Sequence, residues 1–216
     1  MNDKELLLSE EQVDFLTEMM NMGAGNAATA LSQMLECVVD VKIPAVHVVP
    51  APKVPSILDD PSLPVTCVRM GMVGDVAGAM FFVVPDEQKT NLIRLMERGT
   101  PGPKKKGPDL DLSALAEIGN ILAGVYLTAI HDLCKLDIYH TVPTLAMDMI
   151  QSLLDESLIT LGSQDQTMIL VENEFIVEEK HIRTFLLMIP SFEFVKTLVD
   201  SIGEARKAMR GEAGNE

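Results

Sequence analysis

An acid and an amide recur in this chain with identical spacing. The first copy of the pattern comprises Asp14, Glu18, Asn21 and Pro44, and the second comprises Ser113, Glu117, Asn120 and Pro143. Each residue of the second copy follows its counterpart by 99 positions, and the two 31-residue segments share eight identities. An acid and an amide on a helix surface contribute nothing to packing, so their repetition points to chemistry or binding.

The first copy lies in a predicted long amphipathic helix. The run Ser9-Glu10-Glu11-Gln12 is typical of a capping box, and apolar residues then recur every three or four positions to about Glu36. Side chains at i, i+4 and i+7 share a helix face, so the motif forms a polar stripe ending at Gly25. A second helix over about 111–134 carries the twin stripe, which ends at Gly124. Because Asn and Gly both disfavour helices, their repetition favours function over stability.

A single Glu-x-x-Asn pair on a helix is usually solvated, so it is the repetition that indicates function. The histidines and cysteines, the other reactive residue types, have no neighbouring residue in the sequence that would make them a catalytic pair. The histidines lie outside the two stripes, and we interpret them as structural or surface residues: His47, His131, His140 and His181. Three widely separated cysteines without a C-x-x-C pair predict free thiols in a reducing cytoplasm. We therefore expect no metal site, no cofactor of the protein's own and no general base.

The composition limits the class of partner. The net charge is −15, and no basic stripe with interleaved aromatic residues is present, which argues against nucleic-acid binding. The only basic run, Lys104-Lys105-Lys106, lies among prolines and is predicted to be a solvated linker. The first residues lack the character of a signal peptide, and no apolar stretch is judged long enough to span a bilayer. A cytoplasmic protein without membrane insertion is expected.

The elements around the two stripes repeat a common plan. After the first helix we expect a strand run over 38–49 interrupted by Pro44, strands over 65–72 and 77–84, and a helix to about Glu97. The second half has strands over 137–142, 167–177 and 181–189, a closing helix over 191–209, and an added helix over 145–154. The predicted fold class is α+β: duplicated halves, about 9–100 and 109–209, share one antiparallel sheet packed with long helices as a two-layer sandwich. They form one domain, followed by a flexible tail over 211–216. Each motif proline is expected to bend a strand behind its helix.

The doubled motif resembles that of the CheC/CheX/FliY family of chemotaxis phosphatases, which dephosphorylate the response regulator CheY. The resemblance covers nearly the whole chain, and no motif position departs from the pattern. Two motifs in one short chain resemble the CheC type, whereas FliY-like members add a flagellar switch domain that we do not expect here. The resemblance implies that Asn21 and Asn120 place the attacking water, while Glu18 and Glu117 pair with the regulator's active-site lysine. Asp14 and Ser113 would support the site helices or their contact surface.

The resemblance also implies where the remaining chemistry resides. The Mg²⁺ and the lysine would belong to the regulator, so this chain would supply positioning alone. A second partner implied by the family is the receptor deamidase CheD, with Asp148 as a polar anchor on the added helix. Alternatively, that segment packs on the sheet and Asp148 is solvated. Two other functions remain open: an adaptor that binds phosphorylated CheY or regulates CheD without turnover, and a component of the flagellar switch.

Overall fold

One antiparallel sheet runs through the computed structural model, which describes residues 8–58, 60, 62–96, 108–161 and 167–212. Its strands are β1 (Asp40–Lys42), β2 (Val46–Pro50), β3 (Pro64–Gly74), β4 (Gly78–Pro85), β5 (Ile138–His140), β6 (Thr144–Met149), β7 (Thr167–Val177) and β8 (Lys180–Pro190). The helices are α1 (Glu10–Leu35), the 3₁₀ turn η1 (Ala51–Lys53), α2 (Val54–Ile57), α3 (Asp86–Met96), α4 (Pro108–Cys134), α5 (Ile150–Leu161) and α6 (Phe192–Glu212).

The two halves exchange strands within this sheet. The strand order is β1-β7-β8-β4-β3-β5, with β2 also on β7 and β6 also on β3. The hairpins β3–β4 and β7–β8 meet through β4 and β8, as in the pair Phe82 and Leu186. Each hairpin is completed at its outer edge by the short strands of the other half. The predicted shared antiparallel sheet and the α+β class are therefore confirmed.

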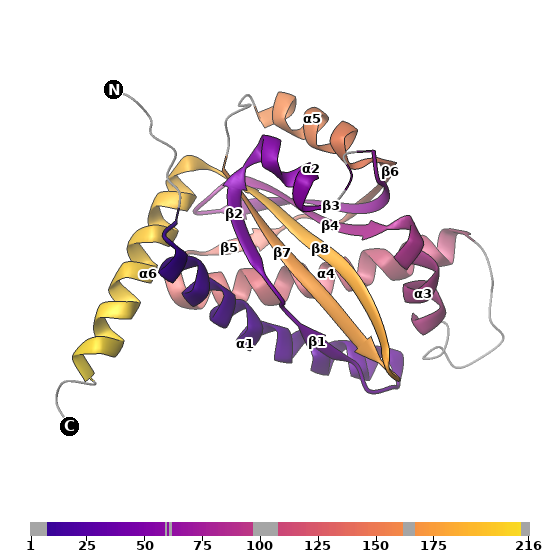
Figure 1. Cartoon of the computed structure of the whole chain (residues 1–216), viewed down its shortest axis with the longest axis horizontal. Coiled ribbons are helices and arrows are strands. Elements are labelled where there is room, and N and C mark those ends of the chain that lie inside the picture. The colour runs from indigo at the N-terminus through magenta and orange to yellow at the C-terminus, as the bar shows by residue number, and fades with distance from the viewer. Residues whose placement is uncertain (1–7, 59, 61, 97–107, 162–166, 213–216) are drawn as a thin grey trace.

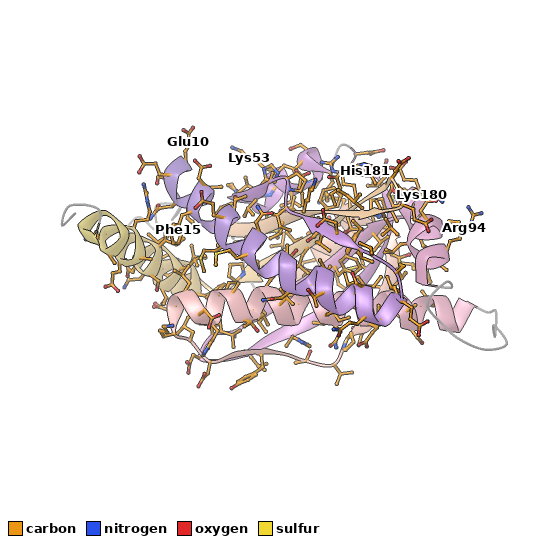
Figure 2. The ribbon with its side chains drawn as sticks, turned by 90° about the horizontal axis from the view of Figure 1, so that it is seen from below. Glu10, Phe15, Lys53, Arg94, Lys180 and His181 are labelled. Atoms are coloured by element: carbon orange, nitrogen blue, oxygen red, sulfur yellow. The ribbon has the colours of Figure 1, made fainter. Side chains whose placement is uncertain are left out.

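The long helices α1 and α4 cover one face of the sheet. They lie side by side and run antiparallel (Figures 1 and 2). Their contact is close at Gly23, where an added Cβ would lie 3.2 Å from Cγ1 of Val125. Buried apolar residues from both helices join those of the sheet in one large core. The buried Tyr126 hydroxyl of α4 donates to the Asn173 side chain of β7, which fixes α4 to the strands, and burial raises the pKa of Tyr126.

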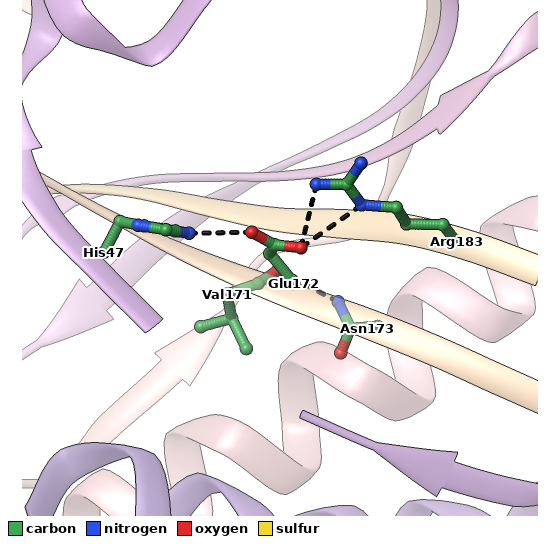
Figure 3. Close-up of polar contacts among 5 residues, drawn as sticks. All are labelled: His47, Val171, Glu172, Asn173 and Arg183. Atoms are coloured by element: carbon green, nitrogen blue, oxygen red, sulfur yellow. Dashed lines mark hydrogen bonds and ion pairs between the residues drawn. The ribbon is translucent and has the colours of Figure 1, made fainter. Parts of the chain in front are cut away.

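The opposite face of the sheet carries a smaller core beneath η1, α2 and α5. This partial third layer was not expected from the sequence. Beyond it, the same face has a polar strip. Figure 3 shows Glu172 of β7 between His47 of β2 and Arg183 of β8. The carboxylate lies 2.7 Å from Nε2 of His47 and 2.9 Å from Nη2 of Arg183. These contacts join β2 from the first half to the second-half hairpin, so His47 has a structural role.

The same bend occurs in the sheet behind each site helix. Between the pairs Lys42–Glu174 and Val46–Val171, three residues of one strand face two of the other. Between His140–Met72 and Thr144–Arg69, three residues again face two. Pro44 and Pro143 lie within these two extra-residue segments. One extra residue bends and twists a strand, so the expectation that each proline marks a bend behind its helix is confirmed.

Three expectations need correction or lie outside the described residues. The predicted helix over 145–154 is wrong in its first part, because Thr144–Met149 is strand β6, paired with β3, and α5 begins only at Ile150. The closing helix α6 reaches Glu212, so residues 211 and 212 are helical rather than tail. The run Lys104–Lys106 and residues 213–216 lie outside the described residues.

One described helical segment, Leu112–Cys134 within α4, is long and apolar enough to cross a membrane by length and composition. The expectation that no such stretch exists is wrong on that measure. The buried face of α4 contributes Leu115, Leu122 and Tyr126 to the large core. That position is the one a core helix occupies, and it explains the apolar composition.

Candidate functional site

The first polar stripe lies on the flank of α1 that faces the β1–β2 bend. Asp14, Glu18 and Asn21 are exposed. The Asn21 side chain nevertheless has three hydrogen bonds. Its Nδ2 donates to the carbonyl oxygens of Thr17 (3.1 Å) and Ile43 (3.3 Å), and its Oδ1 accepts from the Ile43 backbone N–H (3.0 Å). Ile43 directly precedes Pro44, so the amide fastens the helix to the bend.

The second stripe has the same position on α4 but a different local geometry. Ser113 and Glu117 are exposed and Asn120 is half-buried, facing the β5–β6 bend. Within the described part of the chain, the Asn120 side chain makes no hydrogen bond. The residue that corresponds to Ile43 is Val142, which is 83% exposed, whereas Ile43 is 4% exposed. The second bend therefore leaves the Asn120 amide available to an incoming molecule.

The motif glutamate of each stripe is available for a contact with another molecule. Neither Glu18 nor Glu117 forms an ion pair with another described residue. The glycines that follow each asparagine keep the flank open. An added Cβ at Gly25 would meet nothing within 4 Å, and at Gly124 it would meet only Nε2 of His140, at 3.8 Å. Each stripe thus presents a carboxylate and an amide on a flank without bulky neighbours.

His131 and His140, which were expected to be structural or surface residues, lie beside the second stripe. A cavity of about 520 Å³ opens between α4 and β5, and it is lined by Gly124, Leu127, Thr128, His131, Asp137, Ile138, Tyr139 and His140. The stripe leads into it, because Gly124, Thr128 and His131 continue the spacing of Asn120 along α4. The 99-residue register could have revealed this feature, since His131 and His140 correspond to Ser32 and Val41.

The corresponding end of the first stripe is closed by a local contact. The Ser32 hydroxyl accepts from the Val39 backbone N–H at 2.9 Å and donates to the Val39 carbonyl oxygen at 3.2 Å. The backbone after the helix is therefore held against α1. In the second half, His131 contacts the Leu136 carbonyl oxygen through Nδ1 at 2.7 Å, and the side chain lines the cavity.

The thiols of Cys67 and Cys134 do not add a nucleophile to either stripe. Cys67 is buried in the sheet, and burial raises the pKa of its thiol to about 12. Burial also raises the pKa of Cys134. A raised pKa keeps a thiol protonated and unreactive at neutral pH. Neither residue is suited to nucleophilic attack.

The predicted partner anchor Asp148 is on strand β6 rather than on a helix. It pairs with Val65 of β3, and its Oδ1 accepts from the Met149 backbone N–H at 2.7 Å. Next to it, Met147 and Met149 are 61% and 47% exposed. Ile150 and Leu153 are instead buried in the small core. The segment is thus divided between an exposed strand and a packed helix.

Known proteins share both the repeat and the fold. A model of the CheC-like family matches residues 11–48 and 110–147, the two segments that contain the stripes. The CheY-P phosphatase CheC of Bacillus subtilis (strain 168) is 33% identical over 202 residues, which are 91% of this chain and 96% of that protein. Among solved structures, Thermotoga maritima FliY matches with a TM-score of 0.71 and 20% identity, covering 92% of this chain and 98% of that chain. The FliM middle domain from H. pylori matches with a TM-score of 0.62 and 12% identity, covering 90% of this chain and 99% of that chain.

The structural likenesses show that this chain shares its fold with FliY and with the FliM middle domain. The match in sequence is more specific, because it extends over nearly the whole of both chains at 33% identity. This chain belongs to the CheC-like family.

Proposed function

We propose that this protein hydrolyses the aspartyl phosphate of a CheY-like response regulator. The single observation that carries the proposal is the duplicated Glu/Asn stripe, presented on an open helix flank in front of the same strand bend in both halves. Membership of the CheC-like family supports it, as does the name of the Bacillus subtilis relative, a CheY-P phosphatase.

The proposed roles follow from residue chemistry. Glu18 or Glu117 forms an ion pair with the active-site lysine of the regulator, and this contact sets the position of the helix. Asn21 or Asn120 then orients a water molecule in line with the phosphorus. Water attacks the phosphorus, the bond to the aspartyl oxygen breaks, and inorganic phosphate and the free carboxylate are released. The Mg²⁺ that neutralises developing charge belongs to the regulator, so this chain supplies positioning alone. Asp14 and Ser113 extend the contact along each helix.

The alternative function is a binder of phosphorylated CheY without turnover. A radiolabel decay assay separates the two. Regulator phosphorylated with ³²P is present in large excess over this protein, and loss of label is followed with time. Hydrolysis of many equivalents per molecule supports the phosphatase. Protection of the phosphoryl group, or no effect at substoichiometric amounts, supports the binder and rejects the proposed function.

The asparagine variants test the mechanism itself. Asn21→Ala and Asn120→Ala are each expected to remove part of the activity, and the double variant nearly all of it. The matched control is Asn26→Ala, because Asn26 is an exposed asparagine of α1 outside the stripe. A folded double variant with full turnover would rule out the amide mechanism.

A second partner, the deamidase CheD, is proposed for the β6 edge. Among the described strands β6 pairs with β3 alone and so lies at an edge of the sheet, where Met147 and Met149 are exposed beside Asp148. Flexible methionine side chains suit an adaptable contact surface. Asp148 would be the polar anchor there.

A further inference from the structure

The cavity between α4 and β5 lies on the helix flank that carries the second stripe. Thr128 follows Glu117 by 11 residues, about 16 Å along a helix that rises 1.5 Å per residue. A domain of roughly 100 residues has a radius of gyration of about 13 Å, so one docked receiver domain can reach Glu117 and the cavity together. The cavity therefore lies within reach of a regulator that is docked at Glu117.

The two imidazoles of the cavity have a defined orientation. Nδ1 of His131 lies 2.7 Å from the Leu136 carbonyl oxygen, and Nδ1 of His140 lies 3.2 Å from the Thr141 carbonyl oxygen. A carbonyl oxygen can only accept a hydrogen bond, so the proton of each neutral ring is on Nδ1. Nε2 is then an acceptor in both rings. Nε2 of His140 lies against Gly124, toward the cavity.

The cavity is rich in acceptors and carries negative charge. The Asp137 carboxylate lies 3.7 Å from His131, and its side chain is 69% exposed. Thr128 uses its hydroxyl proton in a bond to the Gly124 carbonyl oxygen, which leaves oxygen lone pairs to accept. The whole chain has a net charge of −15. A cationic side chain complements two acceptor nitrogens, a hydroxyl oxygen and a carboxylate, whereas an acidic side chain is disfavoured.

We infer that this cavity receives a lysine or arginine side chain of the docked response regulator, outside the regulator's phosphorylation site. His131 and His140 are then specificity-determining residues of the second site. The corresponding residues of the first half, Ser32 and Val41, cannot provide this contact, because Ser32 is bonded to the backbone of Val39 and Val41 is buried. The inference rests on the proposed regulator partner, but it concerns docking and not turnover.

The test measures the Kd for Bacillus subtilis CheY held in its active state by beryllofluoride, so that no hydrolysis is needed. Glu18→Lys blocks docking at the first site, so the Kd measured in this first background reports the second site. Glu117→Lys is the matched second background, in which the Kd reports the first site. In the first background, His140→Lys is expected to raise Kd on the order of tenfold by placing like charges together. The neutral His140→Gln is expected to change Kd less than about threefold, since an amide oxygen can still accept. In the second background, His140→Lys leaves Kd unchanged.

Three results with His140→Lys would overturn the inference. A lower Kd for His140→Lys would mean an acidic occupant, and an unchanged Kd would mean an empty cavity. An equal rise in Kd in both backgrounds would mean that the substitution disturbs the fold in general. Circular dichroism checks the fold directly, and His131→Lys checks the cavity with an independent substitution. If the wild-type protein does not bind the regulator at all, the inference and the proposed function both fail. Normal turnover with an insensitive cavity overturns only the inference.

Discussion

The two motif asparagines are predicted to differ in what they contribute to stability and to activity. Asn21 is bonded twice to the Ile43 backbone, whereas Asn120 makes no hydrogen bond within the described residues. Asn21→Ala leaves the N–H and the carbonyl of Ile43 without their partner. At roughly 0.5–1.5 kcal/mol for each net hydrogen bond, the loss is about 1–3 kcal/mol. The better helix propensity of alanine returns about 0.5 kcal/mol.

The balance of these contributions predicts that the two variants differ in Tm. Asn21→Ala is expected to lower stability by about 0.5–2.5 kcal/mol, a decrease in Tm of roughly 1–10 °C for a protein of this size. Asn120→Ala is expected to leave Tm unchanged or raise it slightly, because it gains helix propensity and loses no bond. The gain in helix propensity is therefore expected to offset the lost contacts at Asn120 but not at Asn21.

The loss of turnover should follow the opposite order, with the larger loss in Asn120→Ala. Before Asn21 can orient water it must leave Ile43, at a cost of about 1–3 kcal/mol, whereas Asn120 is already free. Asn120→Ala is thus expected to remove more than half of the turnover and Asn21→Ala less than half. Calorimetry or thermal circular dichroism gives Tm, and the radiolabel assay gives turnover. Equal Tm values for the two variants, or the larger loss of turnover in a fully folded Asn21→Ala, would refute this reasoning.

Three further predictions concern docking. Glu18→Lys and Glu117→Lys should weaken regulator binding more than the alanine variants, and the difference should shrink as salt screens the like charges; a defect independent of both charge and salt would exclude a lysine partner. Gly124→Ala should raise the free energy of unfolding by up to about 1 kcal/mol but weaken docking at the second site, with Gly25→Ala as the matched control; unchanged docking would show that the open flank is not a contact surface. Asp148→Lys should abolish a pull-down with CheD while CheY dephosphorylation stays near normal, and intact CheD binding would place that interface elsewhere.

Local signals in the sequence were sufficient to predict most of the elements. The capping box at Ser9 is present as expected, with Gln12 N bonded to Ser9 Oγ and Ser9 N bonded to Gln12 Oε1. The hairpin strands follow alternating or continuous apolar runs, which fit a pleated sheet with a core on each face. The prediction of a helix over 145–154 was wrong in its first part because Leu145, Met147 and Met149 have no strong local preference against a strand. Pairing with β3 decided their conformation.

The sequence by itself determined that the protein is a duplication with two equivalent polar stripes, because helix periodicity and the 99-residue register are properties of the chain. Only the tertiary structure decided that the two stripes differ. The bend at Pro44 brings the Ile43 backbone to Asn21, while the bend at Pro143 leaves Val142 exposed and Asn120 free. Likewise, His131 and His140 are nine residues apart in the sequence, on different elements, and the packing of β5 beside α4 places both in one cavity. Such contacts depend on how separate elements pack, and no local pattern encodes that.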